Sequence, residues 1–525
     1  MNNATRGLML AIGVLMSCTN YDSLPSLSYM NLDADLWDAE GVVARTDGLY
    51  VRLPYAGGLI RLDPNAKQND TTSVATGKGK VTRLSAAPDG ETLVAFVERY
   101  RCEDASGSGP TTIDDCYGDL VVETEIDVIR DADVIGEIAI DGPFNKIAYA
   151  ADGRFGIAYL DFTDESLNLT GVVNLNSVIA IDLIEGSATP ISVGFAADRV
   201  LFVEDADLGA TKAVVLSRNS VALIDLLQDI PQTEVTFPLT LDPDASVIPV
   251  GVDLTPDGRY ALISVQDSSD LYTLDLESQS INIVELSSSP AAMSVDASAE
   301  STVLVFDKRS KVDVLDHAFF DIETFNLDEA MDQIEAGDGY AVLWNDNEKH
   351  DVYRLDLNSG ELVEYRLQNP AVDLEVAPGG DFAVALTRAE DGFGSGVEGV
   401  YDASPGMEIL DLRDDDTQPF LLEGQGLGVV FSQSDTELHA LVLQQGQDYL
   451  YQLDLYTGVA VEIDLSQPPV AIGSMADGSF YITHTSGLGL VSFLDPVTGN
   501  VTEIGGFGAI DLYQPIELLG NGGKS

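Results

Sequence analysis

Acidic side chains at close spacing are the residues of this 525-residue chain best suited to chemistry. Asp33, Asp35 and Asp38 form one cluster, and Asp205 and Asp207 form a second. Carboxylate oxygens at such spacing are hard ligands of the kind that Ca²⁺ takes in proteins. Neither cluster completes an EF-hand loop with its glycine and bidentate glutamate. Two interpretations stay open, a calcium site or a solvated acidic surface, and no other cofactor is indicated.

Two cysteines flank a polar segment of the chain. Cys102 and Cys116 enclose EDASGSGPTTIDD, which lacks the pattern of a buried core. In an oxidising compartment a bridge between them closes a short loop, worth ~3 kcal/mol in the chain-entropy model. The spacing does not suit a zinc site, and no histidine lies nearby in the sequence. We expect a disulfide, with two free thiols as the alternative.

The local motifs of common catalytic sites are missing from the sequence. The four histidines fall far apart without HExxH spacing, and GFGSG at 392–396 has the wrong offset for a nucleophile elbow. No P-loop or dinucleotide-binding fingerprint occurs. We therefore nominate no catalytic residue.

The charge balance excludes one class of partner. The chain carries 26 Lys+Arg against 87 Asp+Glu, a net charge of −61. Such a charge repels nucleic-acid phosphates, so we expect no nucleic-acid partner.

The N-terminal segment indicates export. Arg6 precedes an apolar run at 8–16 that is too short to span a bilayer. The run ends in LMSC at 15–18, and this Leu-x-Ser-Cys resembles the lipobox of bacterial lipoproteins. The resemblance implies a signal peptide at 1–17, a lipidated Cys18 as the only membrane anchor, and a tether at 18–37. Thr19 follows, rather than an aspartate that retains such proteins at the inner membrane, so we expect the outer membrane, on its periplasmic side or at the cell surface. The alternatives are an ordinary signal peptide cleaved elsewhere and a buried helix.

The elements that would position these residues come from a repeat at 38–520, followed by a short tail at 521–525. One signal is an Asp-Gly-type turn before a β-rich strand, and the other is an apolar strand ending in Leu-Asp or Ile-Asp. The two signals alternate ten times with a basal period near 41 residues. The anchors of the first signal are Asp47, Asp89, Asp152, Asp198, Asp257, Ser298, Asp338, Gly379, Asp435 and Asp477, with the clearest turns at Asp89-Gly90, Asp152-Gly153, Asp257-Gly258 and Asp477-Gly478. The aspartates of the second are Asp63, Asp127, Asp182, Asp225, Asp275, Asp316, Asp356, Asp411, Asp454 and Asp495.

This period, with about four short strands in each unit, predicts an all-β fold, a β-propeller. The pattern resembles the WD40-like and YVTN-type propellers of bacterial envelopes, including the periplasmic propeller of the Tol system. No break in composition separates two rings, so we expect one large ring of about eight to ten blades. All anchors of the repeat receive structural roles as turn residues.

Extra residues in four units predict a binding face. They lie at 97–119, 160–176, 204–215 and 387–404, each assigned to the connection between a second and a third strand. Such connections emerge on one face of a propeller, and repeat proteins often bind through loops of this kind. Neutral variation in loop length is the alternative.

These expectations combine into a lipid-anchored envelope propeller that binds a protein or glycan partner through its inserted loops and is not an enzyme. Its acidic charge favours a basic or calcium-bridged partner. The alternative is a propeller hydrolase of lactonase-like type, with a metal and carboxylates in the central channel and no local sequence motif.

Overall fold

The computed structural model describes residues 41–53, 57–65, 71–74, 76, 79–102, 116, 120–140, 144–162, 174–205, 208–240, 247–306, 308–337, 339–346, 349–390, 403–433, 437–487 and 489–507. The chain divides into two compact units, Met1–Asp35 and Leu36–Ser525, and the first lies wholly outside the described residues. Within the described ranges, no helix has the length and apolar character needed to cross a membrane.

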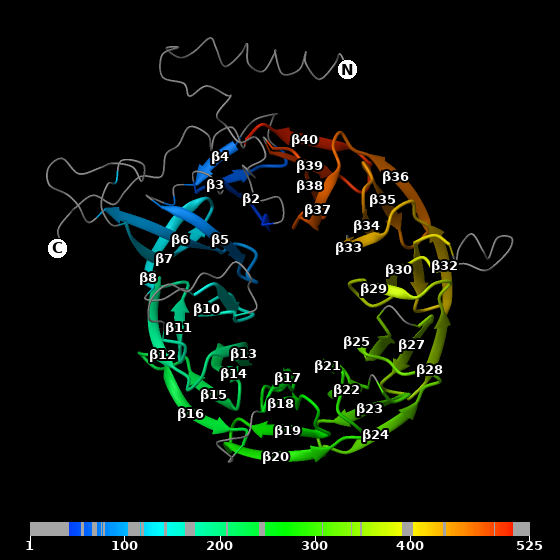
Figure 1. Ribbon diagram of the computed structural model, residues 1–525, viewed down its shortest axis with the longest axis horizontal. Helices are drawn as coiled ribbons and strands as arrows, with labels where there is room; N and C mark the ends of the chain where they lie inside the picture. The colour runs from blue at the N-terminus through cyan, green and yellow to red at the C-terminus, as the bar shows by residue number, and fades with distance from the viewer. Residues whose placement is uncertain are drawn as a thin grey trace, which may run out of the picture. The chain divides into compact units, whose positions relative to one another are not determined.

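The second unit is a ring of ten four-stranded antiparallel sheets, the blades of a β-propeller (Figure 1). Each blade uses four strands that are consecutive in the sequence. The strands of blades 1 to 5 are, in order, β1 (Val43–Arg45), β2 (Gly48–Leu53), β3 (Gly58–Leu62), β4 (Thr71–Val74); β5 (Lys80–Ala86), β6 (Leu93–Cys102), β7 (Leu120–Arg130), β8 (Asp133–Ile140); β9 (Lys146–Tyr149), β10 (Phe155–Tyr159), β11 (Ser177–Asp182), β12 (Ser187–Ser192); β13 (Ala197–Asp205), β14 (Gly209–Ser217), β15 (Ser220–Asp225), β16 (Gln232–Pro238); β17 (Pro249–Leu254), β18 (Tyr260–Val265), β19 (Asp270–Asp275), β20 (Ser280–Glu285).

Blades 6 to 10 repeat the same arrangement. Their strands are β21 (Ala292–Asp296), β22 (Ser301–Val305), β23 (Lys311–Asp316), β24 (Ile322–Asn326); β25 (Gln333–Gly337), β26 (Tyr340–Trp344), β27 (Asp351–Asp356), β28 (Leu362–Arg366); β29 (Ala371–Val376), β30 (Phe382–Thr387), β31 (Gly406–Asp411), β32 (Asp416–Leu421); β33 (Gly426–Gln433), β34 (Leu438–Gln444), β35 (Tyr449–Asp454), β36 (Val459–Asp464); β37 (Pro469–Ser474), β38 (Phe480–His484), β39 (Leu490–Leu494), β40 (Val501–Gly505).

Burial explains the sequence pattern of each blade. The second strands, such as β10 and β22, are buried along their whole length, because neighbouring blades cover both faces of the sheet. A strand that is covered on both faces becomes a continuous apolar run. The outermost strands, such as β20 and β28, consist mostly of exposed and partly buried residues.

The core of the ring is divided into ten apolar clusters, and each one lies between two neighbouring blades. One cluster joins blade 10 to blade 1, with Phe493 and Val491 packed in the same group as Leu49 and Val51. The ring is therefore closed by side-chain packing. The all-β fold and the single large ring are confirmed, and the blade number is ten.

Aspartates organise the turns after the third strands. In blade 7, Asp356 accepts the N–H groups of Asn358 and Ser359 at 2.9 and 2.8 Å. The Ser359 N–H bond leads the interactions that lower the pKa of Asp356, so the carboxylate stays charged and holds the turn. The same capping recurs after the third strands of blades 3, 5, 9 and 10.

Candidate functional site: the two rims of the ring

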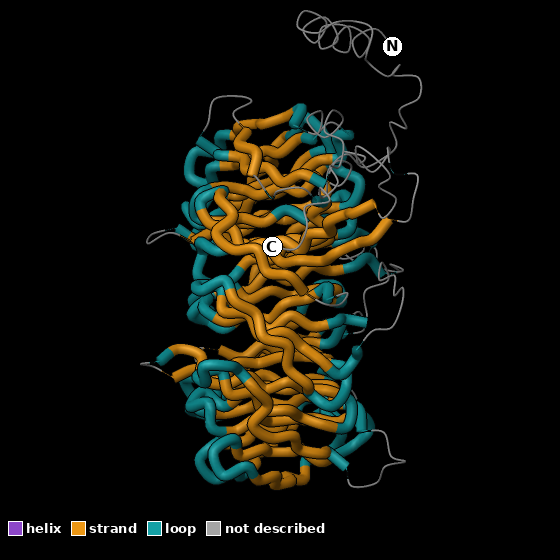
Figure 2. The backbone as a smooth tube through the Cα atoms, turned by 90° about the vertical axis from the view of Figure 1, so that its left-hand side faces the viewer, coloured by secondary structure: helices purple, strands orange, loops and turns teal. Residues whose placement is uncertain are grey.

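The antiparallel topology sorts all connections onto two rims. Connections from second to third strands and from one blade to the next lie on one rim, which we call the insertion rim. Turns between first and second strands and between third and fourth strands lie on the opposite one, the turn rim. Figure 2 shows the strands crossing from rim to rim with the loops gathered at both edges.

Three long connections share the insertion rim. They link β6 to β7 in blade 2, β10 to β11 in blade 3, and β30 to β31 in blade 8. They correspond to the predicted insertions 97–119, 160–176 and 387–404, although residues 97–102 belong to β6 and Thr387 to β30. The centres of all three lie outside the described residues.

The fourth predicted insertion was placed wrongly. Asp198 was assigned to a turn before a second strand, but it lies in the first strand, β13. Segment 204–215 therefore spans the hairpin between β13 and β14, on the turn rim. The second-to-third connection of blade 4 is only Arg218–Asn219, and Asn219 takes the positive φ of 68° that such a tight hairpin needs. The repeat signals failed here because β13 also begins with an Asp and an apolar run.

Blade 2 extends furthest along its second and third strands. β6 and β7 have ten and eleven residues, and their pairing continues to Cys102 opposite Leu120. A disulfide joins Cys102 to Cys116, as the sequence predicts. The bridge fixes Cys116, four residues before β7 begins, to the last residue of β6.

A group of four charges, of which only Glu137 is largely exposed, lies along this hairpin. Arg99 forms an ion pair with Glu125, and its guanidinium also lies 3.6 Å from Asp127 and 3.7 Å from Glu137. Asp127 is fully buried, and neither of its carboxylate oxygens has a hydrogen-bond partner among the described residues. Burial raises the pKa of Asp127 to about 7, opposed by the attraction of Arg99 and reinforced by the charge of Glu137.

The position of Asp127 corrects a second prediction. The repeat assigned it to the end of a third strand, but β7 continues to Arg130 and turns through Asp131 and Ala132, which have φ of 49° and 65°. Asp127 lies inside the strand, opposite Ala95 on one side and Glu137 on the other. Sequence reasoning missed this cluster, because only the hairpin register brings its four charges together.

The remaining predicted turns lie on the turn rim. Gly90, Gly153, Gly258 and Gly478 all have positive φ, between 67° and 83°. In each turn the preceding aspartate accepts the backbone N–H two residues further along, from Asp89, Asp152, Asp257 and Asp477 to residues 91, 154, 259 and 479. These residues hold the backbone of the blades.

The calcium candidates divide between described and undescribed residues. Asp33, Asp35, Asp38 and Asp207 lie outside the described residues, as does Cys18. Asp205 accepts the N–H of Leu208 at 3.0 Å. Within the described part of the chain, no group of three or more His, Cys, Asp or Glu could hold a metal ion.

The innermost strands carry carboxylates that the sequence analysis did not single out. Burial raises the pKa of Asp253 in β17 to about 6, and it also raises the pKa values of Glu335 in β25 and of Asp373 and Glu375 in β29. Glu335 accepts the N–H of Val376 at 3.3 Å and so links blades 7 and 8. The sequence did not reveal these residues, because polar and apolar residues that alternate along a short strand are equally typical of a strand at an exposed edge.

Comparison with known proteins assigns no family to this chain. No protein-family model matches the chain, and no curated protein matches it. A solved structure of Kuenenia stuttgartiensis hydrazine synthase shares 14% identity with a TM-score of 0.32, over 56% of this chain and 92% of that one. The dihydro-heme d1 dehydrogenase NirN in complex with DHE shares 14% identity with a TM-score of 0.38, over 63% of this chain and 71% of that one. At these values the similarity carries no inference about activity.

Proposed function

We propose that this protein is a lipid-anchored, non-catalytic binding module of the bacterial outer membrane, which takes a protein or glycan partner on its insertion rim. The observation that supports this most directly is the placement of the β6–β7, β10–β11 and β30–β31 connections on one rim. Loops on a rigid scaffold are the usual site of recognition.

The blade 2 hairpin offers a contact surface beside the first of these connections. Leu120 and Val122 in β7 are 38% and 49% exposed, and Val122 lies opposite Tyr100 on β6. An exposed apolar strip on a disulfide-linked hairpin loses little conformational entropy when a partner covers it.

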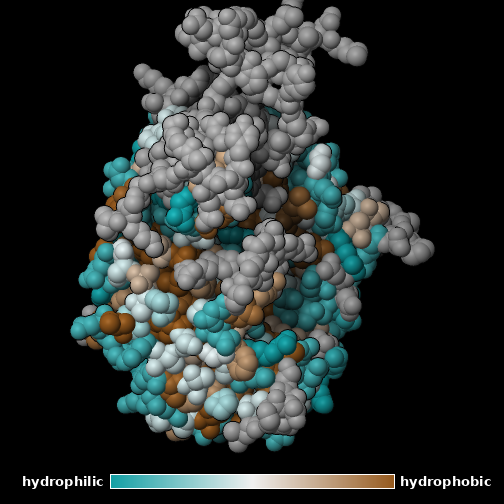
Figure 3. Space-filling model, turned by 60° about the vertical axis from the view of Figure 1, so that its left-hand side comes forward, coloured by the Kyte–Doolittle hydropathy of each residue, from teal (hydrophilic) through white to brown (hydrophobic). Residues whose placement is uncertain are grey.

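The charge of the described surface favours a basic or calcium-bridged partner. Several arginines are already paired within a blade, for example Arg154 with Asp182 at 3.2 Å and Arg259 with Asp275 at 3.3 Å. These pairs leave most of the 87 carboxylates uncompensated. Figure 3 shows hydrophilic and apolar residues interspersed over the described part of the face in view. A negative field of this kind steers cationic partners toward the ring.

Loop replacement tests the proposal. Segments 161–175 and 388–405 are each replaced by Asn-Gly, and a control variant carries three extra residues after Phe319 on the turn rim. Cross-linked partners are then compared by quantitative mass spectrometry from outer-membrane fractions. We expect the loop replacements to lose a partner that the wild type and the control both retain. Retention of every partner by a variant that also has 103–119 replaced refutes the proposal.

The anchor is tested separately. We expect Cys18→Ser to leave the outer-membrane fraction, and protease treatment of intact cells to show which side the insertion rim faces. A Cys18→Ser protein that stays with the outer membrane refutes lipid anchoring at this residue.

The inner-strand carboxylates favour a second candidate function, that of a hydrolase. Glu335 lines a cavity of about 330 Å³ between blades 7 and 8, and a carboxyl group with a raised pKa can act as a general acid. Hydrolysis of a lactone or ester panel by the wild type, lost in Glu335→Gln and kept in Glu462→Gln on an outer strand, would establish this candidate. Equal activity of the two variants would exclude it.

A further inference from the structure

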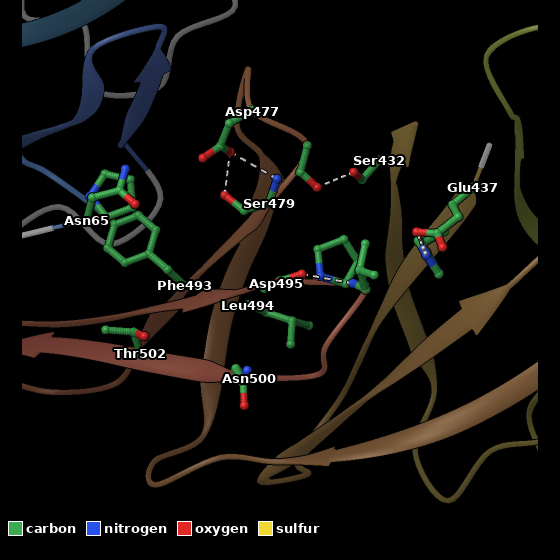
Figure 4. Close-up of a pocket in the computed structure, with 15 residues that line it drawn as sticks. Asn65, Ser432, Glu437, Asp477, Ser479, Phe493, Leu494, Asp495, Asn500 and Thr502 are labelled. Atoms are coloured by element: carbon green, nitrogen blue, oxygen red, sulfur yellow. Dashed lines mark hydrogen bonds and ion pairs between the residues drawn. The ribbon is translucent and has the colours of Figure 1, made fainter. Parts of the chain in front are cut away.

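A second cavity opens on the turn rim where blades 9, 10 and 1 meet. Its volume is about 410 Å³. Glu437 and His439 line it from blade 9, Asp477 and Asp495 from blade 10, and Asn65 from blade 1 (Figure 4). It lies on the rim opposite the long connections and does not depend on the function proposed for them.

This cavity occupies the junction at which the ring closes. We call the boundary between blade 10 and blade 1 the seam. Blade 1 contains only the first four strands and blade 10 only the last four, so neither blade takes a strand from the other end of the chain. At each boundary between two blades, one pair of strands has the most extensive contact. Among the described residues, this contact is smaller at the seam than at any other boundary. The seam therefore depends on its apolar cluster, and the cavity lies beside that cluster.

The lining is acidic and contains no lysine or arginine among the described residues. Asp495 accepts the hydroxyl of Thr498 at 2.8 Å, and this hydrogen bond leads the interactions that lower its pKa, so Asp495 carries its charge at neutral pH. Glu437 is 41% exposed in its side chain. Together with Asp477, these groups place three carboxylates around one hollow.

An unsatisfied buried side chain adds independent evidence for a ligand. His439 is only 8% exposed, and neither ring nitrogen has a hydrogen-bond partner among the described residues. Its Nε2 lies 3.6 Å from the Glu437 carboxylate, beyond hydrogen-bond distance. Buried polar groups are nearly always satisfied in native proteins, and a ligand in the cavity would satisfy this ring.

We propose that this cavity binds a small organic cation, an amine or guanidinium compound, and that the bound cation stabilises closure of the ring. A metal ion suits the lining less well, because no three His, Cys, Asp or Glu side chains among the described residues are grouped so as to hold one. An elongated organic cation can distribute its N–H donors over separate acceptors. It touches three blades at once, so it binds the closed ring in preference to an opened one.

The first experiment uses agmatine, which carries an amine at one end and a guanidinium at the other, with the full-length protein at constant ionic strength. Binding is measured by calorimetry and the Tm by thermal unfolding. We expect saturable binding and a Tm that rises with agmatine concentration in the wild type. Glu437→Gln should weaken agmatine binding by up to about fivefold, as expected for loss of one partly exposed ion pair.

The matched control is Glu462→Gln, which removes the same charge from the outer strand of blade 9 and should bind agmatine like the wild type. A second variant, Asn65→Lys, brings a tethered amine from blade 1 to the cavity and should raise the Tm without agmatine while reducing its binding. No saturable binding by the wild type, or equal binding by the Glu437 and Glu462 variants, overturns the proposal. The second result would assign the effect to general screening of the acidic surface.

Discussion

Replacing Asp127 by asparagine should stabilise the protein above neutral pH. The change keeps the volume of the side chain but removes a charge that is fully buried and has no hydrogen bond among the described residues. Arg99 keeps its ion pair with Glu125. A variant that loses a buried charge without leaving the opposite charge unpaired avoids the usual cost of breaking a buried pair.

The size of the effect follows from the pKa of Asp127. Burial raises it from an ordinary value of 3.8 to about 7. The folded state therefore binds this proton more tightly than the unfolded state, and stability falls as the pH rises from about 4 to about 7. The pKa difference corresponds to about 4 kcal/mol, an upper limit reached only when Asp127 is fully ionised in the fold. At pH 8 Asp127→Asn should approach this gain, and at pH 4 the two proteins should be similar.

Urea unfolding of the oxidised protein at pH 8, 6 and 4 measures the difference between wild type and variant. Asp133→Asn, at the exposed start of β8, is the control and should follow the wild type at every pH. Taking the difference in the free energy of unfolding between variant and wild type at each pH cancels the contribution of all other titrating groups. If Asp127→Asn is less stable than the wild type at pH 8, attraction by Arg99 outweighs burial and the reasoning is refuted.

Four further variants test the hairpin, the turns and the seam. Replacing both Cys102 and Cys116 by serine should cost up to about 3 kcal/mol by thermal unfolding, and a reductant should then lower the Tm of the wild type only. Gly499→Ala, at φ +67° with open space, should cost about 1 kcal/mol. Gly153→Ala has the same backbone conformation but places its Cβ 2.6 Å from a side chain of blade 2, so it should cost at least about 1 kcal/mol more; equal Tm values would contradict this. Leu49→Ala at the seam should cost about 3 kcal/mol and increase protease cleavage in blades 1 and 10, whereas an equally buried leucine elsewhere should not favour those blades.

Much of the fold could be predicted from the repeat, because its signals report local backbone requirements. The glycine at Gly153 is needed for a positive φ, and the aspartate at Asp356 caps the turn that follows its own strand. Both interactions span only a few residues. The disulfide was predictable for a similar reason, because a short polar segment is all that separates the two cysteines in the sequence.

The errors arose where a local signal had two possible strand assignments. Asp198 and Asp127 each fit the spacing of the repeat, yet one lies in a first strand and the other inside a third strand. Only the pairing of β13 with β14 and of β7 with β8 decides between these assignments. The same holds for the inner-strand carboxylates, whose neighbours come from another blade.

The sequence by itself therefore determined the all-β class, most of the turns and the succession of ten repeat units, because each depends on interactions within about 40 residues. The tertiary structure alone decided which rim each connection occupies, how Arg99 meets Asp127 and its neighbours, and where the ring closes. The seam cavity is the clearest example, since Asn65 and Asp495 lie at opposite ends of the sequence and meet only in the closed ring. No local pattern can encode such a meeting, because it depends on the accumulated rotation of all ten blades.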